Sequence, residues 1–274
     1  MDSSVSGLTQ DQIDQYWVDG YLSGLTILTE NQMRIAREKL VVLEQQELQN
    51  NPQQWADSQY LPWSDRKSLW WHWFKPMATH PSILAIVKSI LGPDLLIRNA
   101  DIFVKPARTE QSINWHVDCT ASTEDAGKML SVWFAISESD PDNGCMEFLQ
   151  GSHRQPLPSN IKDKNSLSYI GNALERADLS ERRSNVLRPG QMSLHHFRTV
   201  HRSSGNTTNH ARIGFVIRFM AANAKKDAAE TGKGFMVGGE NKPGHFHIEK
   251  SFPVTWKRSA KCELQSAPQD DSID

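Results

Sequence analysis

The amino-acid sequence predicts a mainly β fold, a β-sandwich or jelly roll with helices packed outside it. The first observation is that residues 1–92 carry apolar side chains at the three- and four-residue spacing of helices. The second is that beyond Pro93 the apolar period changes to two, in many short segments. Clusters of Pro, Gly, Asn and Asp separate these segments, as turns separate the strands of a sheet.

Three helices are expected in the first part of the chain. The Trp-rich residues 63–73 lie between the second and the third, and we interpret them as packing on one face of the sheet rather than lining a substrate pocket. Each helix has start or stop signals. These are Thr9 before Gln10–Asp19 with Gly20 after it, the capping box Thr29–Gln32, and His80-Pro81 before a helix that ends at Gly92.

The second part of the chain is expected to supply the strands. Alternating residues of a strand face opposite sides of the sheet, so each segment can turn one side to a core. A polar insertion over residues 160–183 interrupts the series and is expected to be helical or flexible. The expected strands are Leu95–Lys105, Ser112–His116, Met129–Ser137, Cys145–Leu149, Gln191–Phe197 and Arg212–Met220.

No internal repeat or clear linker divides the sequence, so we expect a single domain over residues 1–274. This length is sufficient to bury a large hydrophobic core. Four parts are expected within the domain. They are a mainly helical part (1–92), a jelly-roll core (93–222), a C-terminal flap or extension (223–258) and a disordered tail (259–274).

Composition excludes several functional classes. The 30 basic and 32 acidic residues give a net charge of −2, so no basic excess is available for nucleic acid or an anionic membrane. Three cysteines without C-x-x-C spacing argue against a disulfide framework and a cysteine-based zinc site. Neither a signal peptide nor an apolar run long enough to span a membrane is evident. We therefore expect a cytoplasmic monomer or homodimer without a nucleic-acid or membrane partner.

A candidate metal site lies at the end of one expected strand. Residues two apart on a strand point to the same face, so His116 and Asp118 can present a nitrogen and an oxygen to one point. A second histidine from another strand would complete a two-histidine, one-carboxylate triad, which suits Fe(II) and leaves positions open. The alternative is a hydrogen-bonded pair at a strand end. From spacing, the second histidine could be His195, His196, His201 or His210.

Three sequence blocks follow one another over roughly residues 97–220. The first contains I-F-V-K-P at 102–106 and ends in W-H-V-D at 115–118. The second contains V-W-F-A-I at 132–136 and D-N-G-C-M-E-F-L-Q-G-S-H at 142–153. The third runs from Pro189-Gly190 through His201-x-Ser203-x-x-Asn206 to Arg212. In content and order these blocks resemble the phytanoyl-CoA dioxygenase (PhyH) family of Fe(II)/2-oxoglutarate-dependent oxygenases.

The resemblance implies a double-stranded β-helix (cupin-like) fold and gives roles to matching residues. His116, Asp118 and His201 would be the catalytic iron ligands, and Arg212 would bind the distal carboxylate of 2-oxoglutarate, which suits a guanidinium fork. The implied reaction consumes O2 and 2-oxoglutarate, releases succinate and CO2, and hydroxylates an unactivated C–H bond of a small-molecule metabolite. Related halogenases have Ala or Gly in place of this carboxylate, so Asp118 favours hydroxylation.

Further residues are candidates for binding the co-substrate or the substrate. Ser203 shares the inward face with His201 and could bind the co-substrate carboxylate. Trp133 matches an aromatic residue near the co-substrate, and Asn99 is a polar residue expected to point inward; core packing and a solvated face are the alternatives. His196 matches a histidine that lies near the metal in the family. The candidates for substrate contact are Lys105, Arg198 and His196.

Other functions remain open at this point. Desaturation, or another oxidative step in natural-product biosynthesis, would use the same triad. A non-catalytic jelly-roll binding module would predict that a ligand or Arg212 is missing, and all four residues are present. A zinc or nickel hydrolase or isomerase would predict that Arg212 is dispensable.

Overall fold

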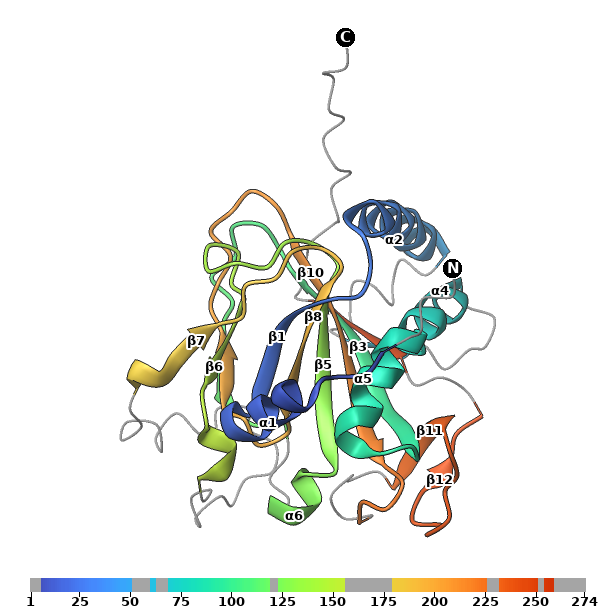
Figure 1. Cartoon of the computed structure of the whole chain (residues 1–274). Coiled ribbons are helices and arrows are strands. Elements are labelled where there is room, and N and C mark those ends of the chain that lie inside the picture. The colour runs from blue at the N-terminus through green and yellow to red at the C-terminus, as the bar shows by residue number, and fades with distance from the viewer. Residues whose placement is uncertain are drawn as a thin grey trace.

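Two β-sheets form the body of the molecule (Figure 1), and residues of both line one pocket. This confirms the mainly β, jelly-roll fold with flanking helices that the sequence predicts. Within the described part of the chain, no helix is long and apolar enough to cross a membrane. The computed structural model describes residues 6–50, 60–62, 69–118, 123–155, 179–225, 232–250 and 254–258.

The larger sheet has nine strands among the described residues. Its central order is β1-β8-β5-β10-β3-β11-β12, while β13 pairs with β3 and β2 pairs with β13. Most neighbours are antiparallel, and β10 pairs along its whole length with β3. The strands are β1 (Tyr21–Thr26), β2 (Tyr60–Pro62), β3 (Leu95–Lys105), β5 (Met129–Ala135), β8 (Gln191–His196), β10 (Arg212–Ala221), β11 (Lys233–Gly238), β12 (His247–Ile248) and β13 (Val254–Arg258).

The smaller sheet has the order β4-β9-β6-β7. Its strands are antiparallel, and β9 lies in the centre between β4 and β6. Short 3-10 turns flank this sheet. The elements are β4 (Ile113–His116), β6 (Met146–Leu149), β7 (Arg182–Ser184), β9 (His201–Ser203), η1 (Ser152–Arg154) and η2 (Leu179–Glu181).

Helices cover the outer face of the larger sheet. Figure 1 shows α2, α4 and α5 gathered beside it, on the side away from β6 and β7. The apolar positions of α5 that the helical period predicts, such as Ile83 and Val87, pack into the main core. The helices are α1 (Gln10–Asp19), α2 (Glu30–Asn50), α4 (Leu69–Ala78), α5 (Pro81–Leu91) and α6 (Thr123–Ala126).

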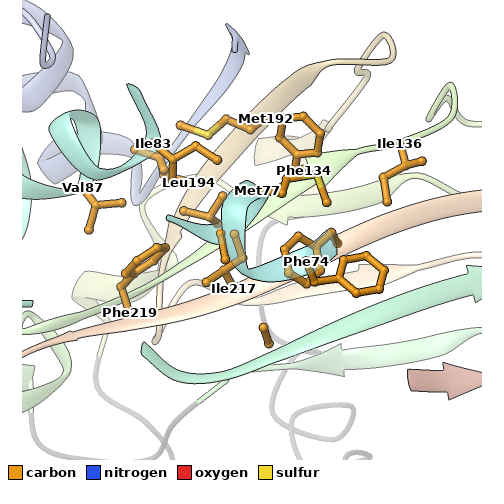
Figure 2. Packing of buried hydrophobic residues seen from close by; sticks show 14 of the residues in the cluster. Phe74, Met77, Ile83, Val87, Phe134, Ile136, Met192, Leu194, Ile217 and Phe219 are labelled. Carbon is orange, nitrogen blue, oxygen red and sulfur yellow. The ribbon is translucent and has the colours of Figure 1, made fainter. Parts of the chain in front are cut away.

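Strand β10 shows how the sheet separates its core from its site. Ile217 and Phe219 point to the helices, where they lie near Phe74 and Val87 in the apolar cluster of Figure 2. The alternate residues of β10 point the other way, because successive side chains of a strand face opposite sides. Three of them, Arg212, Val216 and Arg218, line the pocket between the sheets.

Two segments contain strands that the sequence analysis did not name. The mainly helical first part of the chain holds strand β1 between its helices, because Tyr21–Thr26 pairs with β8. In the segment expected to be a flap or extension, β11 pairs with β3 and extends the larger sheet. The expectations for the Trp-rich stretch at 63–68, for most of the insertion at 160–183 and for the tail at 259–274 lie outside the described residues.

Candidate active site

Three potential metal ligands meet between the sheets. His116 ends β4, Asp118 follows it by two residues, and His201 begins β9. Because β4 and β9 pair, His116 lies directly opposite His201. The ligand atoms of all three side chains lie within 4.8 Å of one another, and the two imidazole centroids are 4.1 Å apart. Strand pairing thus selects His201 among the four histidines that spacing left open.

Backbone carbonyl groups fix the orientation of both imidazoles. His116 Nδ1 lies 2.8 Å from the carbonyl oxygen of Asn114, and His201 Nδ1 lies 2.9 Å from that of Thr199. A carbonyl oxygen only accepts hydrogen bonds, so each Nδ1 carries the proton. Each Nε2 therefore keeps its lone pair for a metal, which is the usual arrangement of metal-binding histidines.

The charge states of the triad suit a divalent cation. Burial lowers the pKa of His116 and holds the pKa of His201 well below its usual range, so both rings are neutral near pH 7. Burial also opposes the charge of Asp118, but Arg218 and His195 outweigh it and hold the pKa of this carboxyl well below its usual value. Two neutral imidazoles and one carboxylate are the donor set of Fe(II) oxygenase sites, so the residues fit that ion.

Asp118 contacts three further side chains of the larger sheet. Ser131 Oγ donates to Asp118 Oδ2 at 2.5 Å, and His195 Nε2 lies 3.1 Å from the same oxygen. Arg218 Nη2 lies 3.4 Å from Asp118 Oδ1. The other end of the Arg218 fork donates to Asp101 Oδ2 at 2.6 Å. A hydrogen-bonded and ionic network therefore lies behind the carboxylate of the triad.

Sequence reasoning missed the roles of Ser131, Arg218 and Asp101, and it left His195 only as an alternative ligand. The two-residue period contains part of the signal, since Arg218 shares a face with Arg212. Their contact with Asp118 depends on strands that are distant in the sequence, so no local pattern shows it.

A second polar cluster surrounds Arg212 at the start of β10. Arg212 Nη1 donates to the carbonyl oxygen of Gly144 at 2.7 Å, and the guanidinium carbon lies 5.4 Å from the centre of the Trp133 ring. Among the described residues, the buried Nε of Arg212 has no hydrogen-bond partner. The predicted co-substrate residues Arg212 and Trp133 are therefore adjacent, and the guanidinium has a donor to spare.

Lys105 lies beside this cluster. Its ammonium donates to Ser203 Oγ at 2.6 Å and also to the carbonyl oxygen of Ser204. Ser203 is two residues beyond His201 on β9, so it faces the same side about 7 Å further along the strand. Lys105 was a candidate for substrate contact, and the structure instead places it with the residues predicted to bind the co-substrate.

Burial destabilises the charges of both cations. Burial, followed by the nearby Arg212, lowers the pKa of Lys105 to about 7. Burial likewise lowers the pKa of Arg212 to about 10. Neither side chain forms an ion pair with a carboxylate among the described residues. A buried pair of uncompensated cations favours an anionic ligand, so this end of the site fits a carboxylate.

One pocket of about 450 Å³ joins the two clusters. Its walls come from both sheets. At one end lie the triad, His195 and Arg218, and at the other lie Ser203, Arg212 and Trp133. The remaining lining residues described are Phe103, Ile113, Met146, Val216 and Arg202.

The structure does not bring His196 to the pocket. Strand alternation turns His195 inward and His196 to the opposite side, where its ring lies 5.1 Å from that of His153 and 6.2 Å from that of Trp17. Burial lowers the pKa of His196 to about 3, so this ring is neutral. The neighbouring His195 occupies the inward position and lines the pocket, and the substrate contact expected of His196 stays a prediction.

Two other candidates also lie apart from the pocket lining. Arg198 follows β8 in a turn, and its Nη2 donates to the carbonyl oxygen of Gln155 at 2.7 Å. Asn99 donates to Asp101 Oδ2 at 2.9 Å, so it supports the network behind Asp118. Neither is among the described residues that line the pocket. The expected roles of Arg198 in substrate contact and of Asn99 in co-substrate contact stay predictions.

The fold and the site together define a class, namely jelly-roll proteins with a two-histidine, one-carboxylate metal site. The family model described as phytanoyl-CoA dioxygenase (PhyH) matches residues 18–214. This match covers most of the sequence, and the chain belongs to the PhyH family.

Individual relatives agree with this assignment. A protein of Mus musculus, "Phytanoyl-CoA dioxygenase domain-containing protein 1", is 28% identical over 156 residues, which are 54% of this chain and 53% of the relative. The chain thus spans about half the length of the curated relatives it matches.

Solved structures share the fold. The apo structure of ThoJ, a non-heme monooxygenase, aligns over 89% of both chains with a TM-score of 0.68 and 24% identity. The epimerase SnoN, in complex with Fe3+, alpha ketoglutarate and nogalamycin RO, aligns over 78% of this chain and 83% of its own, with a TM-score of 0.59 and 22% identity.

Proposed function

We propose that this chain is an Fe(II)/2-oxoglutarate-dependent dioxygenase that hydroxylates an unactivated C–H bond of a small-molecule metabolite. The observation that carries the proposal is one pocket with a neutral-histidine and carboxylate triad at one end and the buried, uncompensated cations beside the other. Membership of the PhyH family supports it. The SnoN structure, which contains iron and alpha ketoglutarate, shows that the shared fold can hold both.

Each cluster has a separate task in this proposal. His116, Asp118 and His201 would hold Fe(II), which supplies the activation of O2 when it is bound. Arg212, with its unpartnered Nε, would bind the distal carboxylate of 2-oxoglutarate, and Ser203 would offer its hydroxyl. Lys105 holds the Ser203 hydroxyl and adds positive charge.

The apolar walls exclude water from this region. Trp133 is 2% exposed, and it packs with Met146, Phe148 and Val216 in an inner cluster between the sheets. A dry surrounding strengthens the attraction between the guanidinium and a carboxylate. It also protects a reactive centre from side reactions, which oxidation of an unactivated C–H bond requires.

The presence of Asp118 supports hydroxylation over halogenation, because the carboxylate occupies the place that a halide ion would need. A non-catalytic module would be expected to have lost a ligand or the arginine, and this chain retains both. Desaturation or another oxidative outcome would use the same residues, and product analysis separates these outcomes.

An anaerobic titration with Fe(II) and then 2-oxoglutarate tests the proposal. We expect a visible metal-to-ligand charge-transfer band in the wild-type protein, its loss in His201→Ala, and a much higher 2-oxoglutarate requirement in Arg212→Ala. Thr207→Ala, which changes an exposed side chain, is the control. Absence of the band in folded, iron-loaded protein would refute the proposal. If the band forms, screening candidate metabolites for substrate-dependent succinate release comes next.

A further inference from the structure

The two oxygens of Asp118 have different surroundings. Oδ2 is 2.5 Å from Ser131 Oγ and 3.1 Å from His195 Nε2, so two donors share it. Oδ1 has only the longer, 3.4 Å contact with Arg218 Nη2 among the bonds of the described residues. A carboxylate oxygen has about two lone-pair directions, and both directions of Oδ2 are therefore in use. Oδ1 retains the capacity to bind a cation.

The hydrogen bonding of the two His195 ring nitrogens supports this interpretation. Its contact with a carboxylate requires a proton on Nε2, because a carboxylate oxygen only accepts hydrogen bonds. The Nδ1 of the same ring is buried and has no hydrogen-bond partner among the described residues, although the side chain is only 2% exposed. An unsatisfied buried nitrogen is costly. The ring thus makes its contact with Asp118 and leaves its other nitrogen unsatisfied.

Arg218 is held away from closer contact with Oδ1. Its shorter bond goes to Asp101, whose side chain is 1% exposed and also accepts from Asn99. The pairing of β10 with β3 shifts register beside Arg218 and Asn99. Such bulges commonly redirect side chains next to active sites. The arginine therefore compensates the charge of Asp118 while Oδ1 stays available.

We propose that Ser131 and His195 are positioning residues that restrict Asp118 to one metal-binding oxygen. A carboxylate that bound through both oxygens would take up one of the positions that a facial triad leaves open. The chelating end of 2-oxoglutarate needs two such positions and O2 needs another. The inference rests on the proposed function. It adds that these two donors protect the co-substrate position rather than the metal affinity.

The test compares metal binding with co-substrate binding in anaerobic protein. The key variant is Ser131→Ala combined with His195→Phe, which keeps a ring against Phe148 but removes both donors. Mn(II) affinity is measured by calorimetry, and 2-oxoglutarate affinity is measured from the charge-transfer band with Fe(II). We expect the 2-oxoglutarate Kd to rise about tenfold or more while the Mn(II) Kd stays within about threefold or tightens.

Two further variants serve as controls. His195→Gln places an amide donor near the position of Nε2 and should restore most of the 2-oxoglutarate affinity. Ser193→Ala removes a buried hydroxyl from the same strand, where it accepts from Asn185 and does not touch Asp118, and should leave both affinities unchanged.

Three results would overturn the inference. They are an unchanged 2-oxoglutarate Kd in the double variant, a parallel weakening of Mn(II) and 2-oxoglutarate binding, and a failure of His195→Gln to restore the affinity. If the double variant does not fold, the single variants Ser131→Ala and His195→Phe are compared in the same way. Wild-type protein that binds Mn(II) but forms no band would instead refute the proposed function, so the two failures are distinguishable.

Discussion

Lys105 and Arg212 bring two positive charges into one buried region. Burying these charges lowers the free energy of unfolding of the ligand-free protein. The pKa of Lys105 is about 7 in the folded chain, against 10.5 for an unperturbed lysine. The unfolded chain therefore binds more protons between these values, and the stability of the free protein rises as pH increases from about 7 to about 10.5. An anionic co-substrate would relieve this cost, because it stabilises both charges.

The same lysine predicts a pH dependence of 2-oxoglutarate binding. A bound carboxylate raises the pKa of Lys105, so binding takes up a proton above pH 7 and weakens as pH rises. The weakening approaches tenfold per pH unit well above pH 7, and it amounts to at most about 15-fold between pH 7 and 8.5. Anaerobic titrations of the Fe(II)-loaded protein measure it. In Lys105→Met, binding should be weaker at pH 6.5 and nearly independent of pH. An equal slope in both proteins would contradict the prediction.

Replacing Arg218 should show how much the network around Asp118 contributes to the stability of the fold. In Arg218→Met, the carboxylates of Asp101 and Asp118, whose side chains are 1% and 7% exposed, lose their shared cation. Removing one partner of a buried ion pair costs about 3–5 kcal/mol. The lowered pKa of Asp118 means that its stabilising effect is present above its unfolded pKa and is lost as pH falls.

The difference in the free energy of unfolding between the wild type and Arg218→Met should therefore be largest near pH 7 and shrink below about pH 4. Urea unfolding of metal-free protein at both pH values measures it. Arg34→Met removes the arginine of an exposed pair with Glu38, and it should cost less than about 1 kcal/mol. A similar small cost for Arg218→Met would show that the network adds nothing to stability.

At the scale of elements, the sequence predicts those whose pattern is complete within the segment. The bounds of α1 and β3 match the expected Gln10–Asp19 and Leu95–Lys105, because the first has both caps and the second is an apolar-rich run bounded by Pro93 and Pro106. Strand β1 is not predicted from the sequence, because it is short, contains Gly24 and buries only Leu22. Only its pairing with β8 in the folded sheet identifies it as a strand.

The candidate site likewise contains residues that local motifs identify and residues that only the folded sheet identifies. His116, Asp118, His201 and Arg212 could be assigned because they stand in motifs of fixed spacing. The donors around Asp118 come from β5, β8 and β10, and only the assembled sheet brings them together.

Gly20, at the junction of α1 and β1, lies against residues that orient the site, so its substitution should affect both stability and metal binding. Gly20 has φ +84°, and an added Cβ would lie 2.4 Å from His153 Nδ1 and 2.6 Å from Thr199 Oγ1. Thr199 donates to the Gly20 carbonyl, and its own carbonyl orients His201. Gly20→Ala should thus cost about 1–2 kcal/mol for the backbone, plus about 1–3 kcal/mol for the clash, and should weaken metal binding.

Gly24→Ala is the matched control. Gly24 has a similar φ of +78°, but an added Cβ meets nothing within 4 Å. It should therefore show only the backbone cost, with unchanged Mn(II) affinity. Urea unfolding and Mn(II) calorimetry on both variants separate the two effects. Equal losses in the two proteins would mean that the contact with Thr199 is unimportant.

At the scale of the whole molecule, the site is a polar contact between two sheets. Asp118 follows β4 of the smaller sheet, yet its carboxylate is held by three strands of the larger one. Lys105 of β3 similarly reaches Ser203 of β9. Bound metal and co-substrate would add bonds across the same contact, so both ligands should stabilise the fold as a whole.

Thermal unfolding under anaerobic conditions tests this coupling. A ligand at 100 times its Kd adds about 2.7 kcal/mol to the free energy of unfolding. Each kcal/mol raises the Tm of a domain this size by about 2–4 °C, so the addition of each ligand should raise the Tm by roughly 5–10 °C. Mn(II) should raise the Tm first, and 2-oxoglutarate should raise it again only when Mn(II) is present. In Arg212→Met the Mn(II) step should remain and the 2-oxoglutarate step should largely disappear, because the carboxylate loses its guanidinium. A full 2-oxoglutarate step in that variant, or in metal-free wild type, would show that the co-substrate binds elsewhere and would separate the two clusters that the pocket joins.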